Sequence, residues 1–218
     1  MKEDPACEVR TRKTAQSSGH KAWTRDDFAA FRAYWPVESR ERYAFEVMYR
    51  TCASIGDACR LGPGMIEAEG WLTYRRGKSG SEAVAPTKGG PAWYEPDAWL
   101  DRCRAAHPRH MTFIVTSHGA AKSEKAAAQW FSRVCTKAGL DDLTAHGIRK
   151  GRAAVFKENG ATKDQRMAIL GHETEAQAQH YSKSADLKRV ISGTEVPTHP
   201  EPSSNSADFG SKIKGGLE

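Results

Sequence analysis

Two stretches of strand character lie between two helical blocks, and this order most constrains the fold. The stretches are residues 71–74 (WLTY) and 82–85 (EAVA), and the turn at 77–80 (GKSG) lies between them. This pattern predicts a β-hairpin. Residues 113–115 (FIV) are expected to add a third strand to the small antiparallel sheet. With helices before and after the hairpin, we predict an α+β domain that is mainly α.

Helix-start signals and apolar spacing occupy the rest of the central chain. Thr24 and Asp27 have the spacing of a capping box, and an apolar helical face follows until Pro36. A second capping box begins at Thr162 and includes Gln165. Further helices are expected over residues 38–52, 56–61, 122–138, 145–159, 163–170, 174–183 and 185–192.

The two ends of the chain differ from its body in composition. Residues 1–22 are polar and lack apolar periodicity, whereas 193–218 combine prolines, serines and glycines. We therefore expect a flexible segment over 1–22, one folded domain over 23–192 and a disordered tail over 193–218.

Composition excludes several classes of protein. A hydrophobic content of 39% supports a core, but no apolar run approaches the roughly 18 to 20 residues of a membrane helix. The first residues lack a signal-peptide pattern, so we expect a cytoplasmic protein without a membrane partner. Five cysteines without a C-x-x-C pair argue against a disulfide framework or a zinc ribbon. The net charge of +6 is compatible with a nucleic-acid partner.

Five polar side chains stand out within this framework. His146 and Arg149 open the helix over 145–159, His172 follows the next helix, Tyr181 lies nine residues later, and Lys78 occupies the hairpin turn. Taken singly, such residues are more often caps, packing residues or solvated charges. Together they supply two imidazoles, a guanidinium, a phenol and an amine, a set suited to acid–base chemistry at a phosphate.

Their spacing resembles that of the tyrosine recombinase (phage integrase) family. The family's H-x-x-R box matches 146–149, its G-H box matches 171–172, and its tyrosine and hairpin lysine match Tyr181 and Lys78. The resemblance covers about residues 24–190 and implies that 23–192 form the family's catalytic domain. It implies a site-specific recombinase or integrase that cleaves and rejoins double-stranded DNA through a 3′-phosphotyrosine. No metal or cofactor is implied, and the chain would act as a homo-oligomer, a tetramer on DNA.

The resemblance also implies a role for each residue. Tyr181 would attack the scissile phosphate, although a phenol with a pKa near 10 needs help to lose its proton. Arg149 would grip the non-bridging oxygens. His146 and His172 would hydrogen-bond the phosphate and move protons, and Lys78 would protonate the departing 5′ oxygen.

The chain departs from the family pattern where a second arginine is expected. That position is Ser54, and the usual glycine two residues earlier is Cys52, whereas Asp57 matches the family's acid. Arg50 and Arg60 are the nearest arginines, and either would need rearrangement to reach the phosphate. Because a clamp arginine can be worth several orders of magnitude in rate, we expect Ser54 to make cleavage slow.

A second departure concerns length. Family members place a helical clamping domain of very roughly 100 residues before the catalytic domain, whereas few residues precede Thr24 here. This chain is therefore expected to hold one side of a duplex without encircling it. A catalytically inactive DNA-binding relative remains the alternative function.

Two other motifs favour no separate function. Gly77-Lys78-Ser79 lacks the upstream glycine of a P-loop, because residue 72 is leucine. The pair His107 and His110 flanks a proline and has no nearby cysteine or carboxylate, which favours a loop over a metal site.

Overall fold

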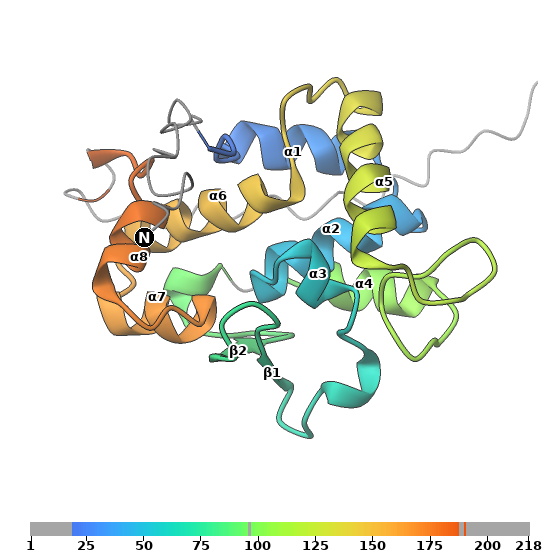
Figure 1. Cartoon of the computed structure of the whole chain (residues 1–218), viewed down its shortest axis with the longest axis horizontal. Coiled ribbons are helices and arrows are strands. Elements are labelled where there is room, and N and C mark those ends of the chain that lie inside the picture. Colours follow the sequence, from blue (N-terminus) through green and yellow to red (C-terminus); the bar gives the residue numbers. More distant parts are fainter. Residues whose placement is uncertain (1–18, 96, 188–189, 191–218) are drawn as a thin grey trace, which may run out of the picture.

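The computed structural model describes residues 19–95, 97–187 and 190, and it confirms an α+β, mainly α fold (Figure 1). The helices before the hairpin are α1 (Arg25–Tyr34), α2 (Arg40–Thr51) and α3 (Ile55–Ala58). The hairpin consists of β1 (Trp71–Arg75) and β2 (Glu82–Pro86), with short 3-10 turns at Pro63–Met65 and Ala92–Tyr94 on either side. The helices after it are α4 (Trp99–Ala106), α5 (Glu124–Lys137), α6 (Ala145–Glu158), α7 (Lys163–Leu170) and α8 (Glu175–Tyr181).

Some of the expected segments fall on residues beyond the described ranges. Residues 1–18 and 191–218 lie outside them, and so does much of the helix expected over 185–192. The expected flexible ends therefore stay predictions. No helix in the described part of the chain is long and apolar enough to cross a membrane.

Local sequence signals explain where several helices begin. Both predicted capping boxes are confirmed, because the Thr24 and Thr162 hydroxyls accept the backbone N–H groups of Asp27 and Gln165. The side chains of Asp27 and Gln165 accept the cap N–H groups in return. Helix α4 was not expected, and its N-cap Ala98 has no side-chain oxygen to mark the start of a helix.

Aromatic side chains form the centre of the core, where α1, α2 and α5 meet. Phe31 of α1 stacks on Phe45 of α2 with ring centroids 4.5 Å apart, and on Phe131 of α5 at 5.8 Å. Trp23 packs against Phe31 and Phe45 from the segment before α1. Each such ring buries on the order of 150–250 Å², so these contacts contribute much of the driving force for docking the helices.

The hairpin is antiparallel, with Trp71 paired to Pro86 and Arg75 paired to Glu82 at its two ends. The expected third strand is wrong, because the described sheet has two strands. Residues 113–115 are buried, but the N–H of Phe113 donates to the carbonyl of Leu61, away from the hairpin. Their apolar, β-branched character reflects burial in the core and not pairing in the sheet.

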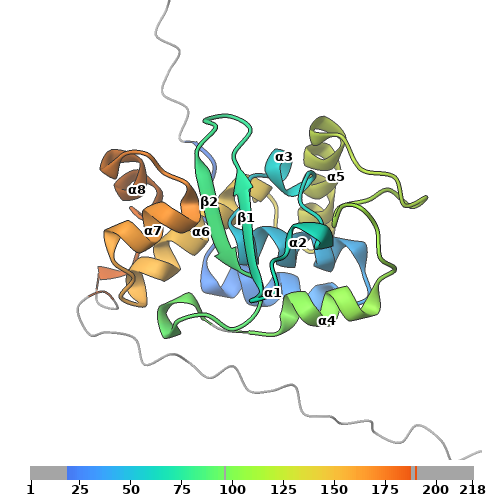
Figure 2. The same cartoon turned by 90° about the horizontal axis from the view of Figure 1, so that it is seen from below.

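Helix α6 runs through the middle of the molecule and packs against α2, α5, α7 and α8. Seen from below, the hairpin lies between α3 on one side and α7 on the other (Figure 2). The hairpin therefore lies next to α3, which precedes it in the chain, and next to α7, which comes much later.

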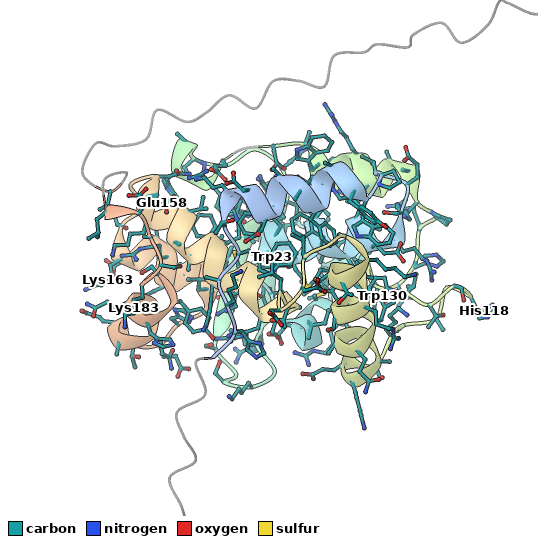
Figure 3. The ribbon with its side chains drawn as sticks, turned by 90° about the horizontal axis from the view of Figure 1, so that it is seen from above. Trp23, His118, Trp130, Glu158, Lys163 and Lys183 are labelled. Atoms are coloured by element: carbon teal, nitrogen blue, oxygen red, sulfur yellow. The ribbon has the colours of Figure 1, made fainter. Side chains whose placement is uncertain are left out.

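Gly147 in the first turn of α6 allows the chain before α1 to lie directly on this helix. A Cβ at Gly147 would come within 2.3 Å of the Lys21 carbonyl and 2.7 Å of the Trp23 ring. Trp23 lies in the middle of the molecule between α1 and α6 (Figure 3), and its indole N–H donates to the carbonyl of Thr144. The glycine after His146 thus has a packing reason of its own.

Buried arginines paired with carboxylates connect the helices. Arg152 of α6 and Arg25 of α1 both contact Glu95, with N–O distances of 2.7 and 2.5 Å. Burial alone would raise the pKa of Glu95, but Arg152 and Arg25 lower it to about 2. Glu46 of α2 accepts from Arg32 at 2.8 Å and from Arg42 at 2.6 Å. We call these six residues the paired cluster.

Candidate active site

The structure brings four of the five predicted site residues together. His146 and Arg149 lie in the first turns of α6, three residues apart and on one face of the helix. His172 follows α7 directly, and Tyr181 is the last residue of α8. Tyr181 Oη lies 3.2 Å from His146 Nε2. The centroid of the Tyr181 ring lies 4.6 Å from the His172 ring centroid and 5.5 Å from Arg149 Cζ.

Backbone carbonyls hold Arg149 in place. Its side chain is buried, with Nη1 donating to the carbonyl of Cys52 at 2.5 Å and Nη2 donating to the carbonyl of Leu170. The Nε atom is buried without a partner among the described residues. Arg149 is therefore a fixed guanidinium with an unused donor.

Cys52 shows why the family pattern has a glycine here. It ends α2 with φ of 54° and ψ of 20°, the left-handed conformation that glycine adopts without strain. This turn directs the Cys52 carbonyl toward Arg149. The backbone at Cys52 therefore has a conformation that glycine would adopt without strain, although the residue is cysteine.

The two histidines of the site are held neutral. Burial lowers the pKa of His172 to about 3, with the charges of Arg149 and Arg76 acting in the same direction. Burial likewise lowers the pKa of His146 to about 4, followed by His20 and Arg149. Both ring nitrogens of His172 are buried and unpartnered within the described part of the chain. Neutral His146 can accept the Tyr181 hydroxyl proton at Nε2, as a general base does.

Lys78 is exposed at the tip of the hairpin and makes no hydrogen bond or ion pair with other described residues. The hairpin is nevertheless held at both flanks. The N–H of Gly77 donates to Asp57 Oδ1 at 2.8 Å, and the Ser81 hydroxyl donates to the Gly171 carbonyl at 2.9 Å. The hairpin that carries Lys78 is thus attached to Gly171, the residue before His172, through Ser81, and to Asp57 through Gly77.

Gly171 lets the hairpin approach α7 this closely. It ends α7 with φ of +54°, which suits glycine, and its N–H satisfies a carbonyl of the last helical turn. A Cβ at this position would lie 2.7 Å from Arg76 Cδ and 3.0 Å from the Glu82 carbonyl. The glycine of the G-H box therefore serves both the turn and the hairpin contact.

Ser54 supplies no positive charge to the site, and its hydroxyl binds Asp57. It caps α3, where its hydroxyl accepts the Asp57 N–H at 3.1 Å and donates to Asp57 Oδ2 at 2.7 Å. Asp57 is buried, and its Oδ1 accepts from Gly77 and from Arg60. The serine thus stabilises the contact between α3 and the hairpin.

Neither neighbouring arginine replaces the missing one. Arg50 is buried and donates to the carbonyls of Pro86, Glu95 and Gly89, so it has a structural role near β2. The Arg60 side chain is 55% exposed and is bound to Asp57.

Two residues near the site were missed in the sequence. Arg76 donates from Nη1 to the Gly171 carbonyl at 3.1 Å, and burial and then Arg149 lower its pKa. His20 lies with its ring centroid 4.9 Å from that of His146, and its carbonyl accepts from Lys150. No motif marks either residue, because Arg76 is one of two adjacent arginines and His20 lies in a polar segment without periodicity.

Comparison with known proteins agrees with the motifs. Residues 26–188 match the phage integrase family, and the chain belongs to that family. It is 28% identical over 152 residues to the tyrosine recombinase XerD of Mycobacterium tuberculosis (strain CDC 1551 / Oshkosh), which covers 67% of this chain and 49% of that protein. The chain thus spans about half the length of this curated relative.

Solved structures show the same fold. A lambda integrase (75-356) dimer bound to a COC′ core site superposes with a TM-score of 0.66 and 21% identity, covering 79% of this chain and 62% of that one. A lambda integrase tetramer bound to a Holliday junction gives a TM-score of 0.65 and 18% identity, covering 81% and 52%.

Proposed function

We propose that this chain is the catalytic domain of a site-specific DNA recombinase or integrase that works through a 3′-phosphotyrosine. One observation carries the proposal: the Tyr181 hydroxyl lies 3.2 Å from Nε2 of an imidazole whose pKa is lowered to about 4. A phenol next to a neutral base, with a buried arginine beside its ring, is arranged for attack on a phosphodiester.

Each bond and proton in the cleavage step has a place. Tyr181 Oη attacks the phosphorus while His146 Nε2 takes the phenolic proton, and the bond from phosphorus to the 5′ oxygen breaks. Lys78 protonates the departing 5′ oxygen when the hairpin closes on DNA. Rejoining is the reverse reaction, in which a 5′ hydroxyl attacks and the bond between phosphorus and Tyr181 breaks. One phosphodiester replaces another, so no outside energy source is needed.

Arg149 and His172 act on the charge of the transition state. The unused Nε–H of Arg149 and the single ring N–H of neutral His172 are donors that non-bridging oxygens could accept. Because these groups are already fixed and desolvated, they lose little freedom when the phosphate binds. Loss of one such donor costs on the order of 100- to 1,000-fold in rate.

The partner in this proposal is double-stranded DNA. The net charge of +6 favours a polyanion, and affinity carried by phosphate contacts should fall steeply with added salt. The chain would act as a homo-oligomer, in line with the tetrameric lambda integrase on a Holliday junction.

Covalent trapping tests the proposal. The full chain is incubated with short nicked suicide duplexes of random sequence, and denaturing gels report protein bound covalently to DNA. We expect an adduct with the native chain and none with Tyr181→Phe. Tyr34→Phe, which alters a tyrosine that is 53% exposed outside the site, should keep it. Salt-sensitive DNA binding without any adduct would instead identify an inactive DNA-binding relative.

A further inference from the structure

Arg76 reaches the site from the hairpin, one residue after β1 ends. Its Nη1 donates to the carbonyl of Gly171, while Arg149 Nη2 donates to the carbonyl of Leu170. Two guanidinium groups from elements far apart in the chain therefore bind consecutive carbonyls at the end of α7. His172 is the next residue.

These two arginines have no carboxylate between them. Among the described residues, neither Arg76 nor Arg149 forms an ion pair, whereas each arginine of the paired cluster has a carboxylate partner. The Nε atoms of both are buried without a partner. Like charges held this close are unfavourable unless an anion binds between them, so the arrangement points to an anionic ligand.

The carboxylate of Asp57 does not fill this role. Its two oxygens are occupied by Ser54, Gly77 and Arg60. The Gly77 contact instead fixes the backbone next to Arg76. Ser54, at the position where the family has an arginine, is thus connected through Asp57 to the hairpin segment that carries Arg76.

We propose that Arg76 is the second arginine of the scissile-phosphate site and supplies from the hairpin the charge that Ser54 lacks. This rests on the proposed function. Arg76 would donate to a non-bridging oxygen opposite Arg149, giving the phosphate two charge-assisted contacts. Lys78 lies two residues further along the same hairpin, so this one element would supply both groups.

Single substitutions with a matched control give the first test. In the suicide-duplex assay, Arg76→Gln should lower the rate of adduct formation about 100-fold or more. Arg75→Gln, an exposed arginine one residue earlier, should stay within about 3-fold of the native chain. Arg76→Lys should recover part of the loss, because it keeps the charge but not the planar fork. A native rate for Arg76→Gln would overturn the proposal.

Moving the arginine separates a catalytic from a structural role. Ser54→Arg in the Arg76→Gln background should restore adduct formation at least 10-fold, whereas in the native background it should change the rate less than 10-fold. An arginine at position 54 would restore a charge at the phosphate without recreating the Gly171 bond. Failure of rescue, or a large gain from Ser54→Arg alone, would contradict the proposal.

A binding measurement decides the matter even if no adduct forms. Inorganic phosphate should raise the unfolding midpoint of the native chain and of Arg75→Gln, and less so for Arg76→Gln and Arg149→Gln. Comparison with Arg75→Gln removes the general effect of phosphate as a salt. Equal shifts in all four proteins, or none, would overturn the role of Arg76. No adduct together with the expected shifts would instead remove the recombinase function and leave a phosphate site.

Discussion

Two groups of buried and half-buried arginines in this molecule differ in what neutralises them. In the paired cluster, Arg152 lies against Glu95 at 2.7 Å and each of its neighbours has a carboxylate. In what we call the unpaired cluster, which lies beside His146 and His172, Arg149 and Arg76 donate hydrogen bonds to carbonyl oxygens and form no ion pair with other described residues. The charges of the paired cluster are neutralised within the chain, whereas Arg149 and Arg76 have no carboxylate partner among the described residues, as expected if an anion from outside binds them.

The largest expected effect breaks the paired cluster. Glu95→Gln leaves Arg152 and Arg25 without their carboxylate, so the free energy of unfolding should fall by about 3–5 kcal/mol in urea titrations. The control is Glu175→Gln, which removes an exposed ion pair with Lys163 and should cost less than about 1 kcal/mol. Equal costs for the two variants would show that the paired cluster is not structural.

The two histidines beside the unpaired cluster should make the free energy of unfolding depend on pH. His146 and His172 have folded pKa values of about 4 and 3, below the ordinary value near 6.5. Above pH 6.5 this contribution is fully present. Below pH 6.5 these histidines become protonated in the unfolded chain but stay neutral in the folded chain. The contribution is therefore lost as the pH falls from 6.5 toward the folded pKa values. Between pH 7 and 5 we expect a loss of about 2–4 kcal/mol by urea titration.

A double variant checks that these histidines are responsible. His146→Gln with His172→Gln should flatten the profile between pH 7 and 5, while exposed His118→Gln keeps the native slope. Glu95 does not interfere in this range, because its pKa of about 2 keeps it ionised when folded. An unchanged slope in the double variant would refute the assignment.

A smaller effect is expected at Ser54, which binds the buried carboxylate of Asp57. Ser54→Ala removes the cap of α3 and a donor to buried Asp57, and it should cost about 1–2 kcal/mol. Ser123→Ala, which removes only the cap of α5, should cost about 1 kcal/mol. Thermal or urea unfolding of both variants measures the difference. A smaller cost at Ser54 than at Ser123 would contradict the bond to Asp57.

The smallest expected change is at Cys52. Cys52→Gly relieves the left-handed backbone but removes a buried side chain, so the two effects should offset each other to within about 1 kcal/mol. Adduct formation should also persist, because Arg149 is held by the carbonyl of this residue and not by its thiol. A large loss of activity in a folded variant would show that the side chain matters.

Local signals allowed much of the fold to be predicted. The capping boxes at Thr24 and Thr162 and the turn around Lys78 act over a few residues, so they can be read without knowing the tertiary structure. Residues 113–115 misled because a short apolar run looks the same in a strand and in a buried loop. Helix α4 was missed because Ala98 provides no cap.

By itself, the sequence determined the hairpin, most of the helices, and His146, Arg149, His172 and Tyr181 as candidate site residues, because periodicity and spacing are properties of the chain alone. Only the tertiary structure placed Arg76 beside them, since its side chain meets the Gly171 carbonyl across 95 residues of sequence. It also placed Arg50 elsewhere, where its guanidinium is buried and donates to the carbonyl of Pro86 in β2. An arginine's role depends on which groups neutralise it, and those groups come from elsewhere in the chain.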